Sequence, residues 1–191
     1  MFDTPYYRDC KTFKDHKQLK ENLLSRRHEF CVFDNIFYGK GYSTIGSQEN
    51  LHKEYPYFTD YILGAMREYD DKLKITRMWV NINPTGAYQT RHNHADSDFA
   101  GTYYLQVPEE DSGSIQFYNP SPVVEAMHRM RPYHNFTHMH IPTETDLMIW
   151  PGFLDHEVMY NHSDKERWTV SFLMSLTDED RRDRFPGMIQ P

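Results

Sequence analysis

The sequence is poor in cysteine and has no long apolar run, and both absences narrow the class of protein. Only two of its 191 residues are cysteines, Cys10 and Cys31. That is too few for a disulfide framework, so a reduced, intracellular protein is expected. No apolar stretch approaches the roughly eighteen residues of a membrane span. The segment Met1–Lys20 mixes charged and aromatic residues without the apolar centre of a signal peptide. We therefore expect a soluble, cytoplasmic protein.

An excess of positive charge is also missing. The formal net charge is −7, which argues against a nucleic-acid partner, because such proteins use basic surfaces to neutralise phosphates. Aromatic residues make up 15% of the chain, and an aromatic-rich sequence punctuated by glycine and proline favours β-sheet. The length suits one domain with a sizeable core.

Two amphipathic helical patterns precede a series of strand patterns. Residues 15–25 and 57–69 each place apolar side chains on one stripe, and Pro56 suits the first turn of the second helix. From Lys74 onward the pattern changes to short β-prone segments separated by turn residues. Eight strands are predicted, at residues 75–82, 88–94, 101–107, 114–118, 137–141, 147–150, 156–160 and 167–176.

Eight short strands after two helices predict a mainly β fold, a double-stranded β-helix (jelly roll) with two N-terminal supporting helices. The chain 1–191 would be a single domain, with helical support in residues 1–72 and the jelly-roll core in 73–177. Residues 178–191 are predicted to be an extended tail. Residues 120–135 have no clear period, which is typical of a long loop with a short helix.

Histidines with metal-ligand spacing stand at one point of this pattern. His92 and His94 are two residues apart, as are His94 and Asp96, and residues two apart on a strand point to the same face. His156 follows a Pro-Gly turn later in the chain. Iron oxygenases bind their metal with two imidazoles and a carboxylate, so either pair could combine with His156. A His94–Asp96 pair would supply a negative charge, whereas a His92–His94 pair would make a neutral three-histidine site.

A candidate anion site follows on the last predicted strand. Arg167, Thr169 and Ser171 alternate there and should share the inner face of the barrel. The planar guanidinium of Arg167 suits a carboxylate, and one of the two hydroxyl groups could bond the same anion. Histidine ligands followed by an arginine suggest a mononuclear iron enzyme that uses an acidic co-substrate.

These motifs resemble the 2-oxoglutarate/Fe(II)-dependent oxygenases of marine bacteria and cyanophages. The resemblance extends in order from Lys74 to Leu176. It rests on residues 81–89, 92–94, 101–105, 114–120, 150–156 and 167–172. The strand at 103–105 and the order of histidine and arginine are also similar to those of prolyl hydroxylases.

The resemblance implies one oxygenase domain that binds Fe(II), 2-oxoglutarate and O2, and a hydroxylase that acts on an unidentified small molecule or peptide. It also implies a cytoplasmic location, in a bacterial host cell if a phage encodes the chain. His92 and His156 look like the first and last iron ligands, and Arg167 looks like the partner of the 2-oxoglutarate 5-carboxylate. Tyr104 is favoured over its neighbour Tyr103 as a phenol donor to that carboxylate.

The second iron ligand departs from the pattern of the wider superfamily. An aspartate is expected two residues after the first histidine, but His94 stands there, which leaves Asp96 as its competitor. A cupin-like three-histidine dioxygenase without 2-oxoglutarate is therefore an alternative, and a non-catalytic jelly-roll binding protein is another. Arg167 favours the oxygenase over the first alternative, and the intact candidate ligands favour it over the second. The sequence predicts no oligomeric state.

Overall fold

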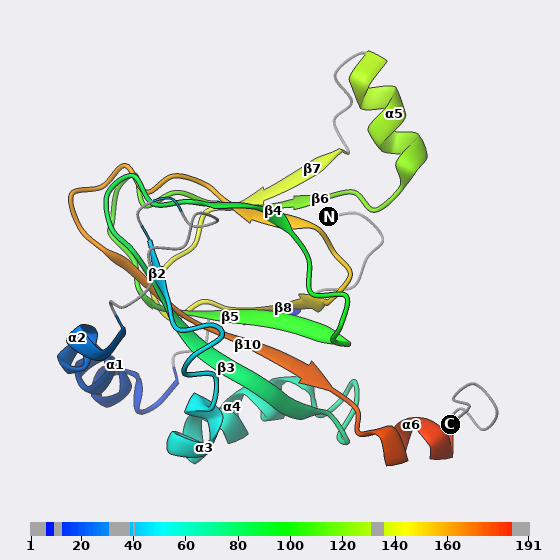
Figure 1. Cartoon of the computed structure of the whole chain (residues 1–191), viewed down its shortest axis with the longest axis horizontal. Coiled ribbons are helices and arrows are strands. Elements are labelled where there is room, and N and C mark those ends of the chain that lie inside the picture. Colours follow the sequence, from blue (N-terminus) through cyan, green and yellow to red (C-terminus); the bar gives the residue numbers. More distant parts are fainter. Residues whose placement is uncertain (1–6, 10–12, 31–38, 40, 131–135, 185–191) are drawn as a thin grey trace.

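The computed structural model describes residues 7–9, 13–30, 39, 41–130 and 136–184. Two antiparallel sheets face each other in this part of the chain (Figure 1). In spatial order, the large sheet contains β1 (Tyr7–Asp9), β8 (Leu147–Pro151), β5 (Phe99–Gln106), β10 (Arg167–Ser175), β3 (Lys74–Asn83) and β2 (Tyr42–Ser43). The small sheet contains β4 (Gln89–His92), β9 (His156–Val158), β6 (Ile115–Tyr118) and β7 (Thr137–His140).

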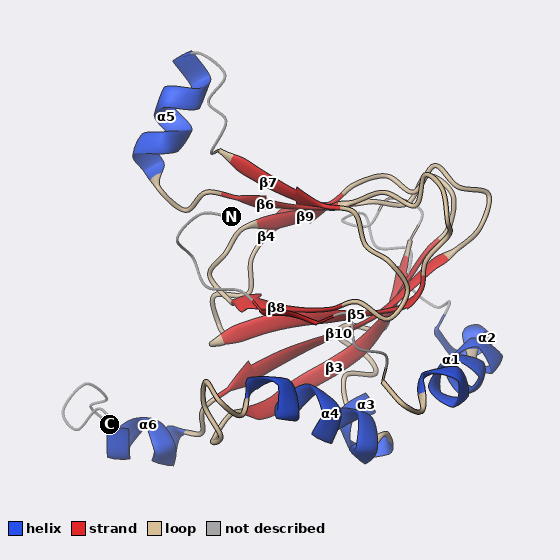
Figure 2. Ribbon diagram, turned by 180° about the vertical axis from the view of Figure 1, so that it is seen from behind, coloured by secondary structure: helices blue, strands red, loops and turns tan. Residues whose placement is uncertain are grey.

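Four helices cover the outer face of the large sheet (Figure 2). They are α1 (His16–Ser25), α2 (Arg27–Phe30), α3 (Leu51–Glu54) and α4 (Pro56–Met66). Helix α5 (Pro122–Met130) projects from the small sheet between β6 and β7, and α6 (Asp178–Arg184) follows β10 (Figure 1). Helices therefore support one sheet from outside and leave the space between the sheets to side chains from the strands.

The alternation of side chains along the central strands produces two separate cores. In β10, Trp168, Val170 and Phe172 belong to the cluster that packs against the helices. In β3 and β5, Trp79 and Tyr104 belong to the second cluster, which lies between the sheets. Because neighbouring residues on a strand point to opposite faces, the polar residues between the apolar ones of β10 are directed into the barrel.

The structure confirms the predicted helices α1 and α4 and a strand within each of the eight predicted segments. It also places the short helix α5 in the segment 120–135, as expected. The fold class, however, is mixed α/β rather than mainly β, with about 28% helix and 32% strand. The one-turn helices α2 and α3 contribute to this difference, because four residues are too few to show a helical period.

The prediction of an extended C-terminal tail was wrong for residues 178–184, which form α6. Thr177 caps this helix, because its hydroxyl accepts a hydrogen bond from the backbone N–H of Asp180 at 3.1 Å and donates to the Asp180 carboxylate at 2.6 Å. Acidic residues fill the first turn and basic residues the last, which suits the helix dipole. The capping sequence was present at 177–180 and could have identified the helix.

In the described part of the chain, no helix has both the length and the apolar character needed to cross a membrane. Cys10 and Cys31 lie outside the described residues, so the reduced state expected from the sequence stays a prediction.

Candidate active site

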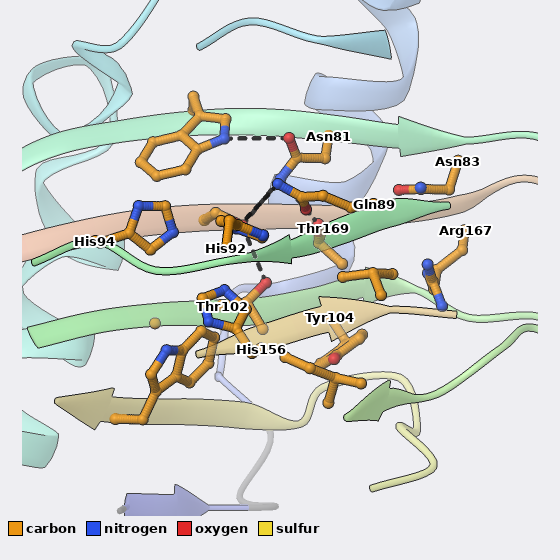
Figure 3. A pocket seen from close by; sticks show the side chains of 16 residues that line it. Asn81, Asn83, Gln89, His92, His94, Thr102, Tyr104, His156, Arg167 and Thr169 are labelled. Carbon is orange, nitrogen blue, oxygen red and sulfur yellow. Dashed lines mark hydrogen bonds between the residues drawn. The ribbon is translucent and has the colours of Figure 1, made fainter. Parts of the chain in front are cut away.

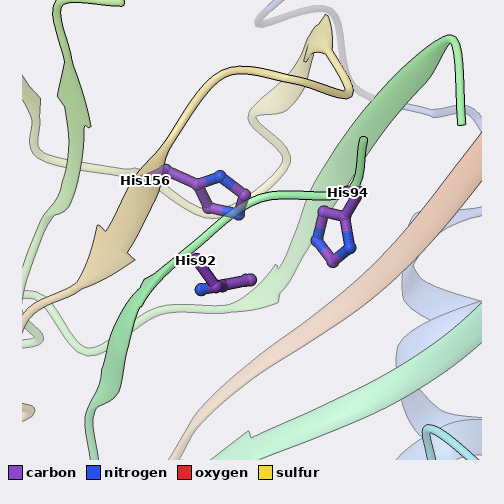
Figure 4. A group of neighbouring side chains, drawn as sticks. All are labelled: His92, His94 and His156. Atoms are coloured by element: carbon purple, nitrogen blue, oxygen red, sulfur yellow. The ribbon is translucent and has the colours of Figure 1, made fainter. Parts of the chain in front are cut away.

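Three histidines meet inside the barrel, two from paired strands and one from the segment that follows the first of these strands (Figure 4). His92 ends β4, His156 begins β9, and the two residues are direct partners in the small sheet. His94 follows two residues after His92. The candidate ligand atoms of the three rings all lie within 4.8 Å of one another. The ring centroids of His92 and His156 are 4.2 Å apart.

The backbone turn before β9 holds the third histidine in place. The backbone N–H of His94 donates to the carbonyl of Gly152 at 2.7 Å, and the N–H of Gly152 donates to the carbonyl of Asp98 at 2.9 Å. A Cβ atom on Gly152 would lie 2.1 Å from the carbonyl oxygen of Ser97 and 2.5 Å from that of His94. Glycine is required here because no side chain fits between the two loops.

Hydrogen bonds to carbonyl groups determine which nitrogen of two rings can bind a metal. Nδ1 of His92 lies 2.7 Å from the carbonyl oxygen of Thr90, and Nδ1 of His156 lies 3.0 Å from that of Leu154. A carbonyl only accepts, so each Nδ1 carries the proton and donates it. Each Nε2 is therefore left with a lone pair, the form in which imidazole binds a metal.

Burial favours the neutral form of all three rings. Desolvation lowers the pKa of His92 and of His156, the latter well below its usual range. Desolvation, together with the neighbouring His92, lowers the pKa of His94 to about 4. The rings are thus uncharged at neutral pH, which suits metal coordination.

Asp96 lies outside this group. Its carboxylate forms an ion pair with Arg77, and its side chain is 63% exposed. The structure therefore brings His92, His94 and His156 together and leaves the carboxylate competitor at the surface.

Arg167 lies at the other end of the same cavity and is 1% exposed (Figure 3). Its Nη1 donates to the carbonyl oxygens of Ser112 at 2.6 Å and Gly113 at 3.2 Å. Its Nε and Nη2 have no hydrogen-bond partner among the described residues. Burial also lowers the pKa of this guanidinium. Unpartnered buried donors are rare and costly. We therefore expect the edge of Arg167 formed by Nε and Nη2 to bind a hydrogen-bond acceptor from a ligand.

The other predicted co-substrate residues line the cavity as well. Tyr104, Thr169 and Ser171 are all part of its wall. Tyr103 points the opposite way, into the helix-covered core, where its hydroxyl lies 2.9 Å from Nδ1 of His16. Burial raises the pKa of the Tyr104 phenol, which keeps it protonated as a donor.

Asn81 organises the wall of the cavity between these hydroxyl groups. Its Oδ1 accepts from Ser43 Oγ at 2.7 Å and from Trp79 Nε1 at 3.1 Å. Its Nδ2 donates to Ser171 Oγ at 2.9 Å. The amide is thus held from both sides.

The sequence reasoning missed Gln89, whose amide contacts His92. No local motif marks it, because its direction depends on the pairing of β4 with β9.

Facing antiparallel sheets, a histidine group that includes the buried His156, and a buried arginine with two unpartnered donors in the same cavity define a jelly-roll protein of the metal-dependent oxygenase class. The chain belongs to the family described as "Putative 2OG-Fe(II) oxygenase", which matches residues 77–173. It is therefore an enzyme of the 2OG-Fe(II) oxygenase family. Membership of this family implies Fe(II) as the metal and 2-oxoglutarate as the co-substrate.

Solved structures share this fold at low sequence identity. A Pseudomonas putida prolyl-4-hydroxylase is 14% identical, with 92% of this chain and 94% of that chain covered and a TM-score of 0.63. A prolyl hydroxylase from Trichoplax adhaerens, in complex with a hypoxia inducible factor peptide fragment, is 14% identical, with coverages of 96% and 88% and a TM-score of 0.63. HygX from Streptomyces hygroscopicus, with nickel and 2-oxoglutarate bound, is 10% identical, with coverages of 92% and 84% and a TM-score of 0.64.

Among proteins of curated function, none matches this sequence. The comparisons do not support a cyanophage origin.

Proposed function

We propose that the protein is a hydroxylase that converts 2-oxoglutarate, O2 and a peptidyl substrate to succinate, CO2 and the hydroxylated product. In this proposal His92, His94 and His156 hold Fe(II), and Arg167 binds the 5-carboxylate of 2-oxoglutarate. The bound iron would supply the activation of oxygen. The neutral imidazoles and the unpartnered guanidinium edge fit these two groups.

The observation that carries the proposal is the free edge of Arg167. Two adjacent N–H donors of a guanidinium match the two oxygens of a carboxylate, and this pairing is strongest away from water. Among the described residues that line the cavity, none is acidic. A divalent metal and Arg167 together would give the cavity three positive charges, and a dianionic co-substrate would offset two of them.

The remaining polar groups of the wall would hold and orient the co-substrate. In our proposal Tyr104 donates its phenolic proton to the carboxylate at Arg167, and Thr169 and Ser171 offer hydroxyl groups from the same strand. Thr169 stands two residues from Arg167 on β10, so both point to the same face.

A peptidyl substrate is favoured by two of the structural likenesses. Both prolyl hydroxylases named above share the fold over more than nine tenths of this chain, at 92% and 96% coverage. One of them was solved with a peptide fragment bound. The acidic net charge of −7 disfavours a nucleic acid.

The test is Fe(II)- and O2-dependent formation of succinate from 2-oxoglutarate, measured with pools of peptides and, separately, pools of metabolites. We expect stimulation by the peptide pool. Stimulation by the metabolite pool alone would contradict the peptidyl substrate but not the oxygenase activity.

A cupin-like dioxygenase without 2-oxoglutarate is the second candidate, because the three grouped ligands are all histidines. Anaerobic protein with Fe(II) and 2-oxoglutarate separates the two. The proposed function predicts the weak visible charge-transfer band of a chelated keto acid. A flat spectrum with iron bound would favour the cupin-like enzyme.

A further inference from the structure

Gln89 contacts the nitrogen with which His92 would bind a metal. Its amide nitrogen lies 3.1 Å from Nε2 of His92. Because Nδ1 of His92 donates to the carbonyl of Thr90, Nε2 carries a lone pair, and the Gln89 amide donates to it. Both side chains line the cavity (Figure 3).

An irregularity in β4 directs Gln89 to this position. Gln89 is paired with Val158 and His92 with His156, so three steps along β4 match two steps along β9. In a regular strand, residues three apart point to opposite faces. The extra residue of a bulge restores them to the same side, and bulges beside active sites re-aim side chains in this way.

The distance between the Gln89 amide nitrogen and Nε2 of His92 matches that between two neighbouring ligand atoms on one metal ion. Divalent ions hold nitrogen and oxygen ligands at about 2.1 Å, so adjacent ligands in an octahedron are about 3 Å apart. The Gln89 amide nitrogen lies 3.1 Å from Nε2 of His92. A half-turn of the amide places its oxygen where its nitrogen was, and amide oxygens are ligands for hard cations.

The histidine group lacks an oxygen ligand of its own. Its three members offer nitrogen only, and Asp96 is paired with Arg77 at the surface. Gln89 places an amide next to His92, and the oxygen of that amide would supply the oxygen ligand that the three histidines lack.

We propose that Gln89 is a fourth protein ligand of the metal site. It is hydrogen-bonded to His92 in the metal-free protein and binds the metal through Oε1 once the metal takes the lone pair of His92. This inference rests on the proposed function, because it requires His92 to be a metal ligand.

The experiment is a titration of the metal-free protein with Co(II), which reports both affinity and ligand set through its visible absorption. Gln89→Leu removes the amide and should weaken Co(II) binding by about tenfold or more. Gln89→Glu keeps the shape, adds a charge and should tighten binding by about tenfold or more. Gln106→Leu is the matched control, because Gln106 donates to the carbonyl of Glu166 at 3.1 Å and is not part of the cavity wall. It should bind Co(II) like the wild type.

Removal of Gln89 also tests the opposite role, in which its amide hinders metal binding. If its amide only competes with the metal for His92, Gln89→Leu would bind Co(II) more tightly than the wild type. Binding equal to or tighter than that of the wild type overturns the proposal. A failure of the proposed function gives a different result, namely a wild type that does not bind Co(II) or a His92→Ala variant that binds it equally well. Gln89→Glu keeps the test valid if Gln89→Leu does not fold.

Discussion

At the scale of single residues, a substitution of Arg167 should affect the affinity for the co-substrate and not the affinity for the metal. Replacing it with methionine removes both unpartnered donors but keeps much of the side-chain volume. Loss of one partner of a buried, hydrogen-bonded charge pair costs about 2–5 kcal/mol, or about thirtyfold or more in affinity. We expect Arg167→Met to weaken 2-oxoglutarate binding by at least this factor, measured by anaerobic calorimetry, with little change in metal affinity. Arg77→Met is the control, since Arg77 is paired outside the cavity. Equal losses of metal and co-substrate affinity would mean that Arg167 is structural.

The identity of the second metal ligand is a question at the same scale. The grouping of His94 with His92 and His156, and the pairing of Asp96 with Arg77, favour His94. We expect His94→Ala to lose metal retention after desalting, measured as iron per chain, whereas Asp96→Ala keeps it. Metal loss in Asp96→Ala together with retention in His92→Ala would instead assign the site to His94, Asp96 and His156.

At the scale of elements, the turn between β8 and β9 positions two of the histidines. Its Gly152 accepts a hydrogen bond from the backbone of His94, and His156 begins β9. A methyl group at Gly152 would overlap the carbonyl oxygens of Ser97 and His94, so Gly152→Ala should displace the His94 loop. We expect metal affinity to fall by about tenfold or more. Gly64→Ala is the control, because nothing lies within 4 Å of a Cβ added there. That change in α4 should leave metal binding intact and stabilise the protein by about 0.4–1 kcal/mol. Unchanged metal affinity in Gly152→Ala would show that the loop adjusts without moving His94.

At the scale of the whole molecule, helices α1 to α4 and the large sheet share one core, so these parts should unfold as one unit. Ile62 in α4 is fully buried in the cluster that also contains Val80 and Phe172 of the sheet. We expect Ile62→Ala to lower the unfolding free energy by about 2–5 kcal/mol, with coincident transitions by circular dichroism and tryptophan fluorescence. Tyr57→Ala, at a side chain that is 75% exposed, should change it by less than about 0.5 kcal/mol. Separate transitions for helices and sheets would contradict a single domain.

The sequence alone determined those features that depend on local periodicity and on the order of motifs. Alternation along a strand was enough to put Arg167, Thr169 and Ser171 on one face and to separate Tyr104 from Tyr103, and the structure places these residues accordingly. The two longer helices were also predictable, because each shows several turns of an apolar stripe.

Only the tertiary structure decided which groups meet. His94 and Asp96 are equivalent by spacing, but the pairing of Asp96 with Arg77 of β3 removes it from the histidine group. Gln89 turns inward because β4 carries one residue more than β9 between two paired positions. Such choices depend on the register and approach of distant segments, which the composition and period of one strand do not contain.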